Sequence, residues 1–175
     1  KPFATYFYDY SSVSAGNIVS WQWSFGDGAS STIKDPVHTF TAPGVYDVAL
    51  IVTTDKGCKD TLTRYKYITV SPAPDAYFTE KPEITTLINA LVVFTDGSSI
   101  TSGSIVSWSW NFGDILSDSM NISMLQNPDH QYSDTGTYII TLTVTSDKNC
   151  VAVYIDSVRI NSEYILFAPS AFTPA

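Results

Sequence analysis

Two similar stretches decide the fold of this chain: IVSWQWSFGD at residues 18–27 and IVSWSWNFGD at residues 105–114. In each stretch Trp, Trp and Phe occupy alternate positions, with Ser, Gln or Asn between them. Successive side chains point to opposite faces of a β-strand, so each stretch predicts a half-buried strand with one aromatic face. All four tryptophans of the chain lie in these two strands, and we expect them to belong to two hydrophobic cores.

The repeat extends well beyond these strands. Residues 7–27 map onto residues 94–114 without a gap, and residues 36–46 map onto 128–138 after five extra residues in the second copy. An internal repeat within 175 residues predicts two small domains. We expect domain one at 1–71, a proline-rich linker at 72–75, domain two at 76–162, and a tail or the start of a further domain at 163–175.

The remaining pattern is that of short strands separated by turns. Residues 44–52 and 136–144 alternate apolar and polar or small side chains, and Gly, Pro and Asp mark the turns between such runs. The composition is 14% aromatic and only 15% charged, which suits β-sheets better than helices. We therefore predict an all-β chain that folds as two tandem immunoglobulin-like β-sandwiches.

The two copies differ at their beginnings. The second has an early strand signal at Ala76–Thr79, whereas only residues 1–6 precede the matching part of the first. We therefore expect the first strand of domain one to be truncated. The linker Ser71–Asp75 contains two prolines, which predicts two units in line with restricted bending.

Charge limits the classes of partner. The formal net charge is −8 and the isoelectric point is about 4.4, and the excess acid lies after residue 72. Phosphate backbones and anionic lipid surfaces repel such a chain, so we expect neither nucleic acid nor membrane as a partner. No apolar run is long enough to cross a bilayer, so we expect no membrane insertion.

The ordered motifs of both copies resemble those of PKD (polycystic kidney disease) domains. That family carries W-x-F-G-D-G, then N-P-x-H-x-Y, then G-x-Y-x-V-x-L-x-V. The matching segments are Trp23–Gly28, Asp35–Phe40 and Gly44–Val52 in the first copy, and Trp110–Asp114, Asn127–Tyr132 and Gly136–Val144 in the second. The second copy departs from the pattern at Ile115, where the family has Gly, and in the inserted loop that follows. The resemblance implies PKD-type β-sandwiches.

A shorter resemblance lies at the end of the chain. Residues 165–174, ILFAPSAFTP, resemble the opening of the gliding-motility-associated C-terminal domain of Bacteroidetes surface proteins. That resemblance implies export by type IX secretion to the outer cell surface or the medium. Together the two resemblances imply non-catalytic spacer or stalk domains of a large adhesin-like protein that contact proteins or polysaccharides, the secretion or attachment machinery among them. The alternative is an accessory carbohydrate- or protein-binding module of a secreted hydrolase.

The only two histidines, His38 and His130, occupy the same position of the repeat. A structural hydrogen bond recurs in tandem domains, whereas a catalytic residue rarely needs duplication. No Ser or Cys is visibly paired with either histidine, so the sequence predicts a structural role and no enzyme activity.

The aspartates that end the aromatic strands, Asp27 and Asp114, have two interpretations. A turn Asp accepts backbone N–H bonds and fixes the turn. Alternatively, carboxylates near strand ends bind Ca²⁺, which takes six to eight oxygen ligands. The calcium candidates lie in the acidic second copy: Asp96, Asp114, Asp118 and Asp147. We expect no other cofactor.

The sequence also leads to predictions about the two cysteines and about possible contact surfaces. Cys58 and Cys150 lie at matched positions of separate units, too far apart to pair, and we expect Cys150 to be a free, buried thiol. Surface contacts through aromatic rings are expected in less regular parts, at Tyr8, Tyr10, Tyr65 and Tyr67. Contacts through the inserted loop, Ile115–Gln126, are an alternative, and that loop contains the glycosylation-type sequon Asn121–Ser123.

Overall fold

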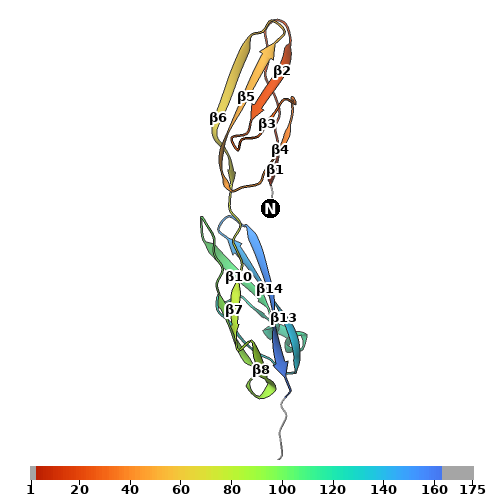
Figure 1. Cartoon of the computed structure of the whole chain (residues 1–175), viewed down its shortest axis with the longest axis vertical. Helices are drawn as coiled ribbons and strands as arrows, with labels where there is room; N and C mark the ends of the chain where they lie inside the picture. Colours follow the sequence, from red (N-terminus) through yellow and green to blue (C-terminus); the bar gives the residue numbers. More distant parts are fainter. Residues whose placement is uncertain (1–2, 163–175) are drawn as a thin grey trace, which may run out of the picture. The chain divides into compact units, whose positions relative to one another are not determined.

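The computed structural model describes residues 3–162, and the chain divides into two compact units (Figure 1). Unit one is Lys1–Pro72 and unit two is Ala73–Ala175, so the division falls at the edge of the expected linker. The expected tail at 163–175, including the stretch that resembles a sorting domain, lies outside the described residues. No helix in the described part is long and apolar enough to cross a membrane.

In the described part of unit one, six strands form two sheets. Its smaller sheet pairs β1 with β4, and its larger sheet has the order β3-β2-β5-β6. The aromatic strand β2 is an inner strand of the larger sheet, between β3 and β5. The strands are β1 (Phe3–Tyr6), β2 (Ile18–Ser24), β3 (Ser30–Ser31), β4 (Val37–Phe40), β5 (Gly44–Thr54) and β6 (Lys59–Val70).

Unit two repeats this arrangement with additional elements. One sheet has the order β12-β9-β7 and the other β11-β10-β13-β14-β8. The second aromatic strand, β10, is again an inner strand. The elements are β7 (Phe78–Lys81), β8 (Ile84–Thr86), the 3₁₀ helix η1 (Leu87–Asn89), β9 (Leu91–Asp96), β10 (Ile105–Asn111), the 3₁₀ helix η2 (Ile115–Asn121), β11 (Ile122–Ser123), β12 (Asp129–Gln131), β13 (Gly136–Ser146) and β14 (Val151–Asn161).

Each unit encloses its own hydrophobic core between its two sheets. Trp23 packs with Phe7 and Phe40 in unit one, and Trp110 packs with Phe94 in unit two. The predicted all-β fold of two tandem sandwiches is confirmed, and the tryptophans at the second position of each W-x-W pair are core residues. Aromatic and branched side chains fit these strands because they fill the space between two pleated surfaces.

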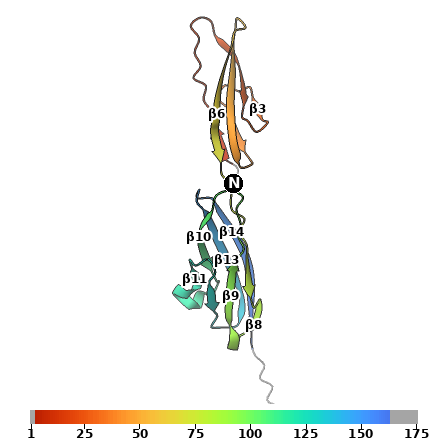
Figure 2. The ribbon, with the colours of Figure 1, turned by 90° about the vertical axis from the view of Figure 1, so that its left-hand side faces the viewer.

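The five extra residues of the second copy form a feature of their own. They lie in η2 and the turn that follows it, which project from the side of unit two beside β11 (Figure 2). In unit one the same connection is a short loop before β3. The insertion therefore leaves the sandwich unchanged and alters only the surface next to β10 and β11.

Candidate functional site

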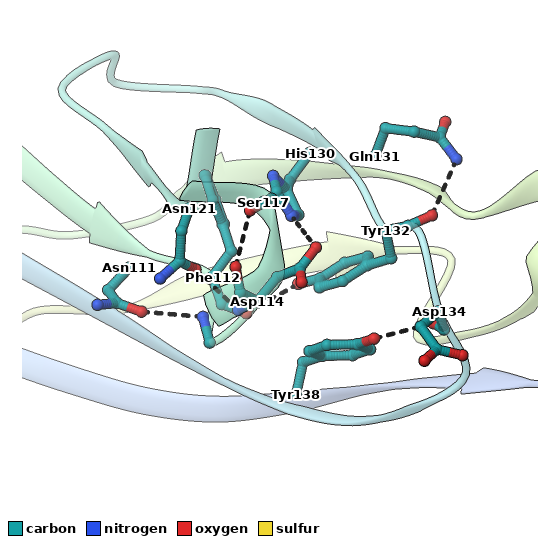
Figure 3. A network of polar contacts seen from close by, with 11 residues as sticks. Asn111, Phe112, Asp114, Ser117, Asn121, His130, Gln131, Tyr132, Asp134 and Tyr138 are labelled. Atoms are coloured by element: carbon teal, nitrogen blue, oxygen red, sulfur yellow. Dashed lines mark hydrogen bonds and ion pairs between the residues drawn. The ribbon is translucent and has the colours of Figure 1, made fainter. Parts of the chain in front are cut away.

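A buried His–Asp pair is the centre of the polar network in unit two (Figure 3). Nε2 of His130, on β12, lies 3.1 Å from Oδ2 of Asp114, which lies three residues after the end of the aromatic strand β10. The two side chains are only 3% and 2% exposed. Phe112 stacks on the imidazole with ring centroids 4.5 Å apart, and Tyr132 meets it edge-on at 4.6 Å. The pair is thus enclosed by aromatic rings.

Tyr132 is a further member of this network. Its hydroxyl donates a hydrogen bond of 3.3 Å to the backbone carbonyl of Phe112. Burial, together with the nearby carboxylate of Asp114, raises the pKa of Tyr132 far above its ordinary value. The phenol therefore stays protonated and remains a hydrogen-bond donor at any physiological pH.

The turn that places Asp114 depends on Gly113. This glycine has φ +73°, and a Cβ atom there would lie 2.5 Å from the backbone oxygen of Ile139. The amide side chains of Asn111 and Asn121 accept hydrogen bonds from the backbone N–H groups of Gly113 (2.9 Å) and Asp114 (2.7 Å). Only glycine fits a left-handed position so close to the neighbouring strand.

The same pair recurs in unit one with less enclosure. Nε2 of His38 lies 2.7 Å from Oδ2 of Asp27, and these side chains are 15% and 19% exposed. Asp27 also accepts the backbone N–H of Ala29 at 3.0 Å, as expected of a turn Asp. Burial favours the neutral acid, but the bonds from His38 and Ala29 outweigh it and lower the pKa of Asp27 below its ordinary value.

This geometry supports a structural role for the His–Asp pair. The nearby hydroxyl of Ser117 donates to the backbone carbonyl of Asp114 at 2.8 Å, so it is not held as a nucleophile against the imidazole. The predicted structural role of both histidines is confirmed, because each binds the turn aspartate of its own unit. Both aspartates pair with the histidine of their own unit, but the turns differ: the Asp27 carboxylate accepts the backbone N–H of Ala29, whereas the backbone N–H of Asp114 donates to the side chain of Asn121.

A second carboxylate in each unit collects several donors. Asp96 accepts the indole N–H of Trp108 at 2.8 Å, the amide of Gln126 at 3.0 Å and the backbone N–H of Ser98 at 3.0 Å. Burial raises the pKa of Asp96, but these hydrogen bonds outweigh that effect and lower it overall. In unit one, Asp9 holds the indole of Trp21 in the same way at 2.7 Å.

This second role of the tryptophans was not expected from the sequence. Trp21 and Trp108 are half-buried, and their rings bridge the core and an aspartate twelve residues earlier. The signal was present, because an Asp precedes the first Trp of the W-x-W motif at the same distance in both copies.

The four calcium candidates do not all lie in one place. Asp96 and Asp114 are engaged as above, Asp118 is exposed on η2, and Asp147 forms an ion pair of 3.4 Å with exposed Lys148. Within residues 3–162, no three His, Cys, Asp or Glu side chains are gathered in a way that could hold a metal ion. Calcium binding at Asp96, Asp114, Asp118 or Asp147 is untested by this arrangement and stays the alternative interpretation.

The exposure of the predicted surface tyrosines, the cysteines and the inserted loop can be compared with expectation. Tyr8, Tyr10, Tyr65 and Tyr67 are exposed, as expected. Cys58 and Cys150 are both unpaired, but the expectation that Cys150 is buried is wrong, because it lies at a hairpin turn and is partly exposed. The inserted loop exposes a run of large apolar side chains that includes both methionines of the chain: Ile115, Leu116, Met120, Ile122, Met124 and Leu125.

Comparison with known families agrees with this architecture. The family model described as PKD domain matches residues 5–70 and again residues 71–160. The chain belongs to the PKD domain family. Its two PKD domains are non-catalytic modules, and the motif residues identified in the sequence are those that build the His–Asp turn in both units.

Curated proteins with similar segments are large proteases. The chain is 53% identical over 51 residues to the pre-pro-metalloprotease PrtV of Vibrio cholerae, which is 29% of this chain and 6% of that protein. It is 57% identical over 42 residues to the collagenase ColQ1 of Bacillus cereus, 24% of this chain and 4% of that protein. The matches therefore span less than a tenth of these relatives.

Solved structures of PKD domains are also similar to part of the chain. The PKD1 domain of Epp from Vibrio anguillarum is 26% identical, covers 54% of this chain and 100% of its own, and has a TM-score of 0.46. The PKD1 domain of PrtV from Vibrio cholerae is 29% identical, covers 53% of this chain and 99% of its own, and has a TM-score of 0.42.

Proposed function

We propose that this chain is a spacer and contact region of a larger extracellular or cell-surface protein. The observation that supports the proposal best is the duplicated His–Asp turn, in which each ionisable side chain is engaged by its own domain. Such a network stabilises a sandwich. In this proposal, catalytic or adhesive activity belongs to other domains of the protein. Two small domains of this kind hold a distal adhesive or catalytic module away from the surface to which the protein is attached.

The inserted loop of unit two is the contact surface that we favour. Leu116 and Met124 are 78% and 80% exposed, whereas the corresponding loop of unit one, residues 28–35, exposes Ile33 as its one large apolar side chain. Contiguous exposed apolar side chains are a mark of protein-interaction sites. A protein partner therefore suits this loop better than a polysaccharide, and attachment machinery at the cell surface is one source of such a partner.

A second function is favoured by the comparisons. The curated proteins with similar segments are named a metalloprotease and collagenases, which supports an accessory module of a secreted hydrolase. In that role the PKD domains bind the polymer that the attached enzyme cleaves. The exposed tyrosines of unit one, such as Tyr8 and Tyr10, are available for such a contact.

Export by type IX secretion is a further element of the proposal. It rests on the resemblance of residues 165–174 to a sorting domain. The domains encoded next to this region test it directly, since a complete sorting domain after residue 175 supports the surface-protein role. A catalytic protease domain in the same polypeptide supports the accessory role instead.

A binding experiment separates the two contact roles. The full chain is tested on immobilised fibrillar collagen, on a polysaccharide array and on outer-membrane proteins, beside a Leu116→Ser/Met124→Ser variant and the surface control Ile33→Ser. If the chain binds a protein and only the Leu116/Met124 variant loses this binding, the result supports the inserted loop as the contact surface. If instead every variant still binds collagen or polysaccharide, the result contradicts the inserted loop as the contact surface and favours the accessory role.

A further inference from the structure

Both methionines of the chain lie in the inserted loop of unit two, the contact surface proposed above. Met120 is the penultimate residue of η2, and Met124 directly follows β11. The equivalent loop of unit one, residues 28–35, contains no sulfur atom. A thioether is a side chain that oxidants modify, so its concentration in this loop makes the loop a candidate modification site.

The side chains of both methionines are open to solvent. Met120 is 68% exposed and Met124 is 80% exposed. A small oxidant therefore reaches both sulfur atoms in the folded chain, and the sandwich does not have to open. The two methionines are part of a group of large apolar side chains that the loop exposes, the others being Ile115, Leu116, Ile122 and Leu125.

Oxidation converts a methionine from an apolar to a polar side chain. A hydroperoxide transfers one oxygen atom to the sulfur: the O–O bond breaks, an S–O bond forms, the sulfur loses two electrons, and the peroxide is reduced to water or an alcohol. The product is a sulfoxide, which is polar and disrupts methionine-rich interfaces. The hydrocarbon side chains of the loop do not react in this way, so the change is confined to Met120 and Met124.

Bonds without sulfur fix the loop beside Met120. The next residue, Asn121, accepts the backbone N–H of Phe112 through its backbone carbonyl at 2.9 Å. Its side-chain oxygen accepts the backbone N–H of Asp114 at 2.7 Å. Oxidation of Met120 leaves both of these hydrogen bonds intact.

The loop is fixed in the same way beside Met124. The next residue, Leu125, accepts the indole N–H of the core residue Trp110 through its backbone carbonyl at 2.9 Å. Its own backbone N–H donates to the hydroxyl of Ser123 at 3.2 Å. Oxidation therefore changes the chemistry of the loop surface and preserves the contacts that position the loop on the sandwich.

We propose that Met120 and Met124 form an oxidation switch for the contact surface of unit two. In the thioether form the loop presents an apolar and adaptable surface to a protein partner. In the sulfoxide form two polar groups interrupt that surface and the partner is released, and enzymatic reduction of the sulfoxides restores the surface. The release of a partner rests on the proposed function of the loop, whereas the oxidation and the change in surface polarity do not.

Hydrogen peroxide tests the switch in the full chain without a partner. The chain carries Cys58→Ser and Cys150→Ser, because both thiols are at least partly exposed and would also react. We expect Met120 and Met124 to oxidise within about threefold of the rate of free methionine, as followed by peptide mass spectrometry. Retention on a phenyl resin should fall, while the melting temperature of unit two should change by less than about 2 °C.

Two variants control this experiment. Met120→Leu/Met124→Leu keeps the size and apolar character of the loop, so its retention should match that of the parent before treatment and should not change with peroxide. Met120→Gln/Met124→Gln should resemble the oxidised parent without any oxidant. Oxidation more than about tenfold slower than that of free methionine would overturn the proposal. Unchanged retention of the oxidised parent, or a melting temperature that falls well beyond the expected limit, would overturn it too.

Binding to immobilised outer-membrane proteins separates a failure of the switch from a failure of the contact surface. Loss of binding on oxidation in the parent, together with retained binding in the Met120→Leu/Met124→Leu variant, supports the switch. If the oxidised parent still binds while Leu116→Ser/Met124→Ser does not, the loop is the contact surface and the switch is wrong. If that serine variant also binds as the parent does, both the contact surface and the switch are wrong.

Discussion

The imidazole of His130 and the carboxylate of Asp114 meet 3.1 Å apart in the core of unit two, although sixteen residues separate them in the sequence. The equivalent pair in unit one, His38 and Asp27, is closer at 2.7 Å but more exposed. The two units therefore contain the same interaction in two environments. This contrast allows the effect of burial to be measured within one chain.

Removing one partner should destabilise unit two more than unit one. His130→Ala leaves the carboxylate of Asp114 buried without its partner, so we expect a loss of about 3 kcal/mol in the free energy of unfolding of unit two. His38→Ala should cost about 1 kcal/mol, because water reaches Asp27. Chemical denaturation, monitored by tryptophan fluorescence, measures the loss of stability in both variants. Asp118→Ala is the exposed control. Equal losses would show that burial does not govern the pair.

Acid should weaken unit two through Asp96. The folded-state pKa of Asp96 is lower than its unfolded value, so the ionised carboxylate stabilises the fold above about pH 4 and this contribution is lost as the pH falls further. We expect Asp96→Asn to lower the free energy of unfolding at pH 7 by on the order of 1 kcal/mol. The difference from the parent chain should shrink towards pH 2. A difference that is constant with pH would contradict this assignment.

The glycines of the F-G-D-G turn offer a matched pair in unit one. Gly26 and Gly28 both have positive φ, but a Cβ atom at Gly26 would clash with the backbone oxygen of Asp47, while Gly28 faces open space. Gly28→Ala should cost about 1 kcal/mol for the left-handed conformation alone. Gly26→Ala adds a backbone clash, so we expect a loss of about 3 kcal/mol or an unfolded unit one. Similar melting temperatures for the two variants would be inconsistent with the close approach to Asp47.

Calcium should have little effect on stability. Asp96 accepts three hydrogen bonds and Asp114 is buried against His130, so both carboxylates have internal partners. We expect the melting temperature to change by less than about 2 °C between buffers with calcium and with EDTA, since a tight site would raise it much more. A larger rise with calcium that disappears in Asp147→Asn would instead establish a site at that end of unit two.

The strands and their repetition were predictable because they depend on local patterns. Alternation in residues 18–25 and 105–112 is set by the two-residue period of a strand, and the turns are marked by Gly and Asp. The structural role of His38 and His130 followed from their matched positions. The partner of each histidine was not predictable by the same means, since it depends on how two distant loops meet.

The amino-acid sequence by itself determined the fold class, the two domains and the residues that form each core, because hydrophobic periodicity and repetition are properties of the chain. Only the tertiary structure decided how each polar residue is used: Asp96 gathers Trp108 and Gln126 from different segments, and Cys150 lies at a partly exposed turn. Burial and hydrogen bonding at these places depend on contacts between residues far apart in sequence, and such contacts exist only once the two sheets have packed.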